Sequence, residues 1–155
     1  MIRAPLLGID HGIKRIGIAV SDRLWLTARE VTVIMRTTRA ADFETISRLI
    51  AEHGASALVV GMPHDELAAE GQHTQADTVA LWIERLRGVT DLPIVTWDEQ
   101  MTSEDAKRIA RRLRRDPRAP IDDLAARVML QSYLDALRDG LAEAPTPRTT
   151  DWSAS

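Results

Sequence analysis

The chain has 155 residues, which is enough for one domain around a single hydrophobic core. It contains no cysteine, and this excludes disulfides, thiolate metal sites and a cysteine nucleophile. The net charge of −3 argues against general binding to nucleic acid, and the lack of a long apolar run or a signal peptide predicts a cytoplasmic protein.

A β-hairpin over residues 6–22 is the first predicted element. Its apolar first strand runs out at Asp10, between Gly8 and Gly12, and a turn over residues 11–15 leads into a second, alternating strand. This places a carboxylate at the mouth of the hairpin, where the glycines let a phosphate or a hydrated metal approach closely. The alternative is that Asp10 caps the turn with its own side chain.

Strands and helices alternate along the rest of the chain. A third strand at 29–35 completes an antiparallel meander, and apolar residues then recur at helical spacing over 41–53 before Gly54. The later predicted elements are, in order, a strand buried on both faces at 57–60, a helix at 74–87, a strand at 93–97, a helix that opens at Thr102 and a last helix at 121–137.

This order predicts an α/β fold with one five-stranded mixed sheet, an antiparallel meander followed by parallel strands, and helices on both faces. Residues 1–140 are expected to form the single domain. The Ala, Pro, Thr and Ser content of residues 141–155 predicts a flexible C-terminal tail.

The last predicted helix carries two acids in its first turn. Asp122 shares a helix face with the apolar Ala126, whereas Asp123 is spaced to form a surface ion pair with Arg127. The alternative for both aspartates is that they cap the helix and favour its dipole. That alternative accounts for an acidic helix start, but not for an acid turned towards the core.

Acids from three distant segments are therefore predicted to meet. Asp10 and the pair Asp98 and Glu99 fall at strand ends, where the ligand sites of such sheets lie, and Asp122 approaches from the last helix. Converging carboxylates suit Mg²⁺ or Mn²⁺. Two such ions about 4 Å apart activate a water and stabilise the leaving oxygen of a phosphodiester.

Other nucleophiles and ligands find little support in the sequence. There is no serine motif of the G-x-S-x-G type, so water is the expected nucleophile. The four histidines are scattered singly, and a lone histidine is more often an ordinary surface residue than a ligand. We leave all four out of the predicted site, with His11 the nearest to an auxiliary role.

The chain resembles the YqgF/RuvX family in four motifs that occur in the same order and spacing over residues 6–138: GIDHGIKRIGIAVSD, VVGMP, DEQMTSEDA and IDDLAARVMLQSYL. These small proteins are described as pre-16S rRNA nucleases and as Holliday junction resolvases. The resemblance implies an RNase H-like fold, catalytic acids at Asp10, Glu99 and Asp122, and Asp98 as a further metal ligand.

The chain also departs from the family pattern. His11, Gly12 and Ile13 stand where the family usually has an aromatic or small residue followed by Gly-Thr. Gln100 replaces an arginine, and the loop at 64–72 adds negative charge where the family commonly carries an Asn and an Asp-Gly pair. These departures concern substrate affinity more than the fold.

Basic residues that could hold phosphates lie in two places. Lys14 and Arg15 are in the first hairpin, close to the predicted acids. Arg108, Arg111 and Arg112 lie in a segment, residues 107–118, with seven basic side chains and one acidic side chain. Such a run predicts either a surface for phosphates or an ordinary solvated helix face.

The leading hypothesis is a Mg²⁺- or Mn²⁺-dependent nuclease that processes the 5′ end of pre-16S rRNA, as a monomer or homodimer, on precursor rRNA or a ribosomal particle. A Holliday junction resolvase acting on DNA is the second interpretation, and it requires a dimer because two opposed cuts need two centres. A non-catalytic RNA-binding factor with the same fold is the third. An actin-like ATPase is disfavoured by length, since that class needs two such domains.

Overall fold

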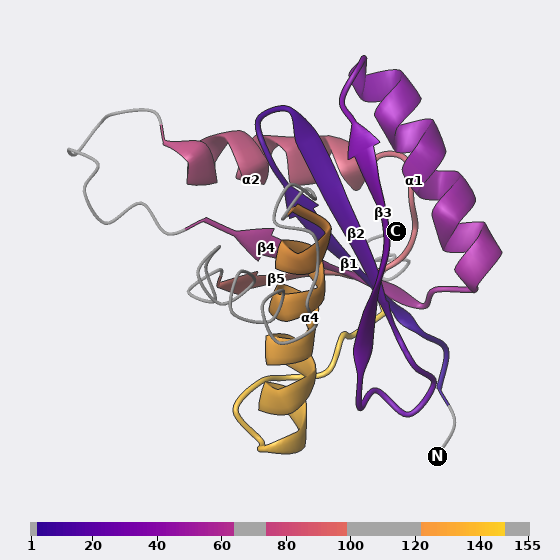
Figure 1. Cartoon of the computed structure of the whole chain (residues 1–155), viewed down its shortest axis with the longest axis vertical. Helices are drawn as coiled ribbons and strands as arrows, with labels where there is room; N and C mark the ends of the chain where they lie inside the picture. Colours follow the sequence, from indigo (N-terminus) through magenta and orange to yellow (C-terminus); the bar gives the residue numbers. More distant parts are fainter. Residues whose placement is uncertain (1–2, 64–73, 99–121, 148–155) are drawn as a thin grey trace, which may run out of the picture.

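The computed structural model describes residues 3–63, 74–98 and 122–147. In this part of the chain the centre is a five-stranded sheet in the order β3-β2-β1-β4-β5, and three helices pack against it (Figure 1). The strands are β1 (Leu6–His11), β2 (Arg15–Ser21), β3 (Ala28–Met35), β4 (Ala57–Met62) and β5 (Ile94–Asp98), and the helices are α1 (Arg39–His53), α2 (Gln75–Leu86) and α4 (Asp122–Arg138).

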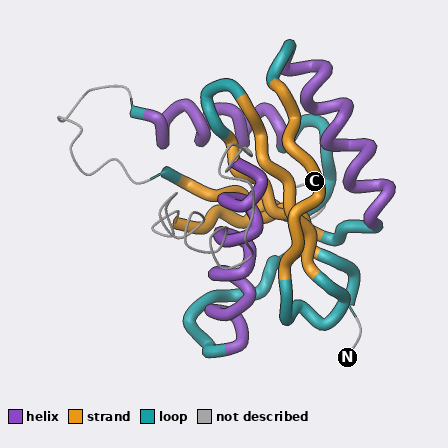
Figure 2. The backbone as a smooth tube through the Cα atoms, in the orientation of Figure 1, coloured by secondary structure: helices purple, strands orange, loops and turns teal. Residues whose placement is uncertain are grey.

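The sheet is mixed, as the order of elements predicts. β1, β2 and β3 form an antiparallel meander, whereas β4 runs parallel to β1 and β5 parallel to β4. Helices cover both faces: α4 lies on one face, and α1 and α2 lie on the other (Figure 2). The predicted α/β fold with helices on both faces is therefore confirmed.

Capping residues fix where the helices begin and end. Thr38 starts α1 by accepting a hydrogen bond from the backbone N–H of Ala41, and Gly54 ends it in a left-handed conformation with φ of 62°. α2 opens with a capping box, in which Thr74 and Asp77 each accept a hydrogen bond from the other's backbone N–H. Both helices lie within two residues of their predicted bounds.

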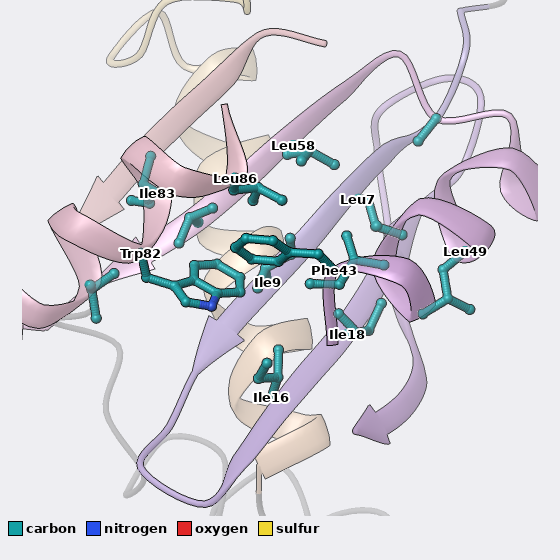
Figure 3. Close-up of a cluster of buried hydrophobic side chains, with 14 of the residues drawn as sticks. Leu7, Ile9, Ile16, Ile18, Phe43, Leu49, Leu58, Trp82, Ile83 and Leu86 are labelled. Carbon is teal, nitrogen blue, oxygen red and sulfur yellow. The ribbon is translucent and has the colours of Figure 1, made fainter. Parts of the chain in front are cut away.

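Two apolar cores lie on opposite faces of the sheet. The larger one joins alternate residues of β1, β2 and β4 to α1 and α2, with the rings of Phe43 and Trp82 at its centre, 5.4 Å apart (Figure 3). The other core joins the remaining strand residues, among them Leu6 and Val59, to the buried face of α4. Strand alternation thus decides which core a side chain enters.

α4 packs closely on the N-terminal strands. A side chain at Gly8 would bring its Cβ within 2.9 Å of the Leu130 Cβ, so the absence of a side chain lets the helix approach β1. Gln131 accepts a hydrogen bond from the backbone N–H of Ala28 at 2.9 Å. The Arg127 guanidinium pairs with the Glu30 carboxylate at 3.2 Å.

Several predicted features lie outside the described residues. These are the helix that opens at Thr102, the basic segment 107–118 and the acidic loop 64–72. The structure does not describe the side chain of Asp123, so the predicted ion pair between Asp123 and Arg127 stays a prediction. The ion pair that Arg127 is observed to form is with Glu30. The flexible tail stays a prediction too.

Within that predicted tail, the structure describes residues 141–147. The backbone carbonyl of Glu143 accepts a hydrogen bond of 2.6 Å from the Tyr133 hydroxyl, and Ala142 packs against the core on the α4 face. The first part of the segment therefore contacts the last helix. None of the described helices is both long enough and apolar enough to cross a lipid bilayer.

Candidate functional site

Asp10 lies inside β1 rather than after it, one residue before the end of the strand. Successive side chains of β1 alternate between the two faces of the sheet. Leu7 and Ile9 pack in the core beneath α1 and α2, whereas Leu6 packs in the core beneath α4. Asp10, an even-numbered residue like Leu6, therefore projects on the face that α4 covers. The residue is half-buried. The hairpin turn behind it depends on Gly12, because a Cβ there would stand 2.7 Å from the Arg15 carbonyl oxygen.

Glycines stand beside Asp10 on both neighbouring strands. Gly17 of β2 is its direct partner in the antiparallel pair. Ile9, Val60 and Thr96 form one row across β1, β4 and β5, so Asp10 follows at the level of Gly61. Because neither glycine has a side chain, the adjacent strands leave space around this carboxylate for a ligand.

The first turn of α4 lies near the same end of β1. Gln131 of α4 contacts Ala28 of β3, and Ala28 lies at the level of the start of β1 in the sheet. Arg127, one turn earlier in α4, contacts Glu30 of β3. Glu30 pairs with Ala19 of β2, which in turn pairs with Gly8 of β1, so this second contact lies two residues further along β1. Four helical residues advance about 6 Å, close to the rise of two strand residues. One further turn towards Asp122, the first residue of α4, reaches the level of Asp10.

Asp98 is the last residue of β5, and it lies on the other face of the sheet. Val95 and Trp97 pack in the α4 core, whereas Ile94 packs against the α1 and α2 core, so alternation places Asp98 with Ile94. Asp10 and Asp98 therefore project from opposite faces. This arrangement disfavours Asp98 as a ligand of an ion held by Asp10, and its role stays a prediction.

The remaining predicted acids cannot be placed in the site. Glu99 lies outside the described residues, and of Asp122 only the backbone is described. Within residues 3–63, 74–98 and 122–147, no three acidic or histidine side chains gather closely enough to hold a metal ion. The predicted donors are all carboxylates, which is the oxygen ligand set that Mg²⁺ and Mn²⁺ prefer.

Arg15 and Lys14 are exposed at the end of the hairpin that carries Asp10. Arg15 is two residues from Gly17, so it projects on the α4 face, diagonal to Asp10 across the strand pair. A diagonal spacing of about 7–8 Å lies within the reach of an arginine side chain. The other predicted phosphate contacts, Arg108, Arg111 and Arg112, are outside the described residues.

His11 is the feature that sequence reasoning undervalued. Its ring is 6% exposed and packs against Trp82, with the ring centroids 4.6 Å apart. Burial, aided by the nearby Arg36 guanidinium, lowers the pKa of His11 to about 4, so the imidazole is neutral at pH 7. The sequence feature that indicates its burial is its position two residues after Ile9, which places both side chains on the same, apolar side of β1.

A cavity of about 160 Å³, lined by both charged and apolar side chains, opens beside the His11 ring on the face opposite Asp10. Its charged lining residues come from the end of β3 and from both helices of that face. These are Arg36, Arg39, Asp42 and Arg85. The predicted hairpin therefore separates two polar regions, one on each face of the sheet.

Comparison with known proteins identifies relatives over almost the whole described chain. The family model described as RuvX: Holliday junction resolvase matches residues 4–136. A protein of Syntrophus aciditrophicus, named "Putative pre-16S rRNA nuclease", is 36% identical over 135 residues, which is 85% of this chain and 89% of the relative. A protein of the same name from Natranaerobius thermophilus is 40% identical over 133 residues, or 84% of this chain and 93% of the relative.

Solved structures share the fold at much lower identity. RuvC of T. thermophilus in complex with a Holliday junction substrate has a TM-score of 0.62 and 15% identity, covering 93% of this chain and all of that one. The fowlpox virus resolvase bound to Holliday junction DNA has a TM-score of 0.52 and 13% identity, covering 86% of this chain and 98% of that one. The sheet and helices are thus those of an RNase H-like protein, and the chain belongs to the RuvX (YqgF) family.

Proposed function

We propose that this protein is a nuclease of the cytoplasm, dependent on Mg²⁺ or Mn²⁺, that hydrolyses phosphodiester bonds of structured RNA at the 5′ end of pre-16S rRNA. Two relatives named "Putative pre-16S rRNA nuclease" match the chain over most of their length, at 36% and 40% identity. The observation within the structure that carries the proposal is the position of Asp10, which lies between two glycines on the face that α4 covers.

Asp10 would be the first ligand of the metal ions in this proposal. Its carboxylate is fixed by a central strand, and a half-buried position keeps it in contact with solvent and substrate. A divalent cation bound there would supply an activated water and stabilise the leaving oxygen. Arg15, on the same face, would hold a phosphate of the substrate strand, a contact that positions the substrate without reading its sequence.

Glu99 and Asp122 complete the proposed ligand set. Asp98, the last residue of β5, projects on the face of the sheet opposite Asp10. Because successive residues of a strand alternate between faces, a β5 strand one residue longer would present position 99 on the face of Asp10. Position 122 precedes the fully buried Ala126 by one helical turn, so the two positions share a face of α4. This counting supports the proposal that both acids act on the side of the sheet that Asp10 occupies.

The test is a cleavage assay on a precursor 16S rRNA 5′ end with the Asp10→Asn variant. With Mg²⁺ or Mn²⁺ present, we expect the rate to fall by more than about a hundredfold, because the variant removes a charged oxygen ligand while keeping the shape of the side chain. The exposed Asp139 provides the matched control, since Asp139→Asn changes the same charge at the far end of α4. Unchanged cleavage by Asp10→Asn would place the activity elsewhere.

A Holliday junction resolvase is the second candidate function. The description of the family model and the RuvC-like fold favour it. Paired cuts on a junction require two centres related by symmetry, so this function predicts a dimer on the substrate. Cleavage of a four-way DNA junction, measured beside the rRNA assay with sedimentation of the protein–junction complex, separates the two functions. A junction left intact by protein that cuts the precursor rRNA would eliminate the resolvase.

A further inference from the structure

We propose that the cavity beside His11 is a binding site for a phosphate group, separate from the nuclease centre and on the opposite face of the sheet. The site lies between the end of β3, α1 and α2, and nothing in the proposed nuclease function uses it. The charge of its rim, the hydrogen-bonding capacity of its floor and its size carry the proposal.

The rim of the cavity is positively charged. Three arginines, Arg36, Arg39 and Arg85, outnumber the single carboxylate of Asp42. The guanidinium groups of Arg39 and Arg85 form no hydrogen bond or ion pair with any residue that the structure describes. Guanidinium groups that converge from separate elements suit a tetrahedral anion, which offers an oxygen to each.

The other two charged side chains already have partners. One Arg36 nitrogen donates hydrogen bonds to the backbone carbonyls of Gly12 and Ile13, at 3.0 and 2.8 Å, which holds the hairpin turn against the end of β3. Asp42 is 4% exposed and accepts a hydrogen bond from the backbone N–H of Thr37 at 3.2 Å. Asp42 therefore shapes the cavity wall, and Arg39 and Arg85 remain to bind a ligand.

The floor of the cavity contains an unsatisfied polar side chain. His11 is buried, and neither Nδ1 nor Nε2 has a hydrogen-bond partner among the described residues. A buried polar group without a partner is costly, so such a group calls for a ligand or an ordered water. An imidazole nitrogen can donate or accept a hydrogen bond, so a phosphate that reached one of these nitrogens would supply the missing partner.

The size of the cavity limits what enters it. A volume of about 160 Å³ is enough for several waters or for a tetrahedral oxyanion. Sites for whole small molecules are larger, about 300–1,000 Å³. We therefore assign the cavity to the phosphate group alone, either as free phosphate or as the terminal phosphate of a nucleic-acid strand that continues outside.

Calorimetric titration of the full-length protein with inorganic phosphate tests the site. EDTA is present throughout, so that no divalent cation contributes. We expect binding by the wild type, a loss of affinity of about a hundredfold in Arg39→Ala/Arg85→Ala, since each charge-assisted contact is worth about tenfold, and no change in Arg48→Ala, an exposed arginine of α1 remote from the cavity. Wild-type protein that binds no phosphate at millimolar concentration, or equal affinity in the double variant, would overturn the proposal.

A second variant tests whether the ligand reaches the buried ring. His11→Phe keeps an aromatic ring against Trp82 and removes both nitrogens. We expect phosphate affinity to fall by about tenfold, with circular dichroism showing a folded protein. Unchanged affinity in this variant would place the phosphate outside the cavity.

Competition distinguishes the two sources of the phosphate. An oligoribonucleotide with a 5′-phosphate is compared with its 5′-hydroxyl counterpart, using Asp10→Asn protein so that the nuclease centre plays no part. Competition by the phosphorylated strand alone assigns the site to strand ends, and competition by neither assigns it to free phosphate. Both results uphold the cavity, and neither depends on whether the protein cleaves RNA.

Discussion

Asp10 and His11 are consecutive residues of β1, and their side chains lie on opposite faces of the sheet. Asp10 faces α4, where the nuclease centre is proposed, whereas His11 packs against Trp82 of α2 beside the arginine-lined cavity. A single strand end therefore serves two polar regions of different chemistry. One region is proposed to bind a divalent cation, and the other an anion.

Replacing Arg15 should weaken the binding of structured RNA without changing which sequence is preferred. Arg15→Ala removes a cation on the face of Asp10, so we expect the slope of log K against log salt concentration to become shallower by about 1. Fluorescence anisotropy at several salt concentrations measures this slope. Arg48→Ala is the control, and an equal change in both variants would assign the effect to net charge alone.

Gly8 should resist any side chain, because the Leu130 Cβ would be only 2.9 Å from a Cβ at this position. We expect Gly8→Ala to lower the free energy of unfolding by about 1–3 kcal/mol through overpacking. In the double variant Gly8→Ala/Leu130→Ala, the Cβ of residue 130 remains, but the contacts at 3.2 Å to Cδ2 and 3.4 Å to Cγ are gone, and the added methyl occupies part of the space that these atoms leave. Urea unfolding should then show a combined loss smaller than the sum of the single losses; strict additivity would contradict the contact.

Gln131 should matter more than an ordinary polar residue on a helix surface. Its amide accepts from the Ala28 N–H at 2.9 Å and donates to the Leu26 carbonyl at 2.8 Å. Because Gln131→Ala leaves a partly buried N–H without a partner, we expect a loss of about 1–3 kcal/mol in the free energy of unfolding. The exposed Glu44 of α1 is the control, with a change within about 0.5 kcal/mol expected for Glu44→Ala.

Tyr133 should make the protein unstable in strong alkali. Burial raises the pKa of its hydroxyl from 10.0 to about 12. In the unfolded chain this group loses its proton first, so stability is fully present below pH 10 and falls as the pH rises towards 12. Tyr133→Phe should remove this part of the decline in the thermal midpoint, at a cost of about 1 kcal/mol at neutral pH for the lost hydrogen bond to Glu143.

The only tyrosine of the chain reports this titration directly. Ultraviolet absorbance of tyrosinate should rise in the folded protein only above the pH at which free tyrosine ionises. A transition at the ordinary value of 10.0 would show that the hydroxyl of Tyr133 is solvated rather than buried.

Local patterns in the sequence sufficed for the elements that the structure describes and for the mixed character of the sheet. Apolar alternation over residues 6–22 gave the hairpin, and apolar residues at helical spacing gave α2 within one residue of its bounds. The face on which each strand residue lies also follows from alternation, as the positions of Asp10 and Asp98 show. Alternation along β5 separates Asp98 from Asp10 only once packing shows that Val95 and Trp97 lie in the α4 core.

Contacts between distant segments escaped that reasoning. The pair of Arg127 with Glu30 joins α4 to β3, and a spacing rule within one helix could suggest only Asp123 as the partner. The cavity beside His11 needs the neighbouring Arg36 and Arg39 together with Arg85, which lies 46 positions further along the chain. No period or motif connects these residues, because packing alone brings them together.

The docking of α4 on the first three strands is a late event in the synthesis of the chain. Gln131 and Ala28 are 103 positions apart, so this contact forms only after nearly all of the chain has left the ribosome. Until then the acid of the first hairpin has no partner from the last helix. If the proposed centre needs Asp122 beside Asp10, a nascent chain that still lacks α4 has no complete centre, and the proposed activity begins only with the finished protein.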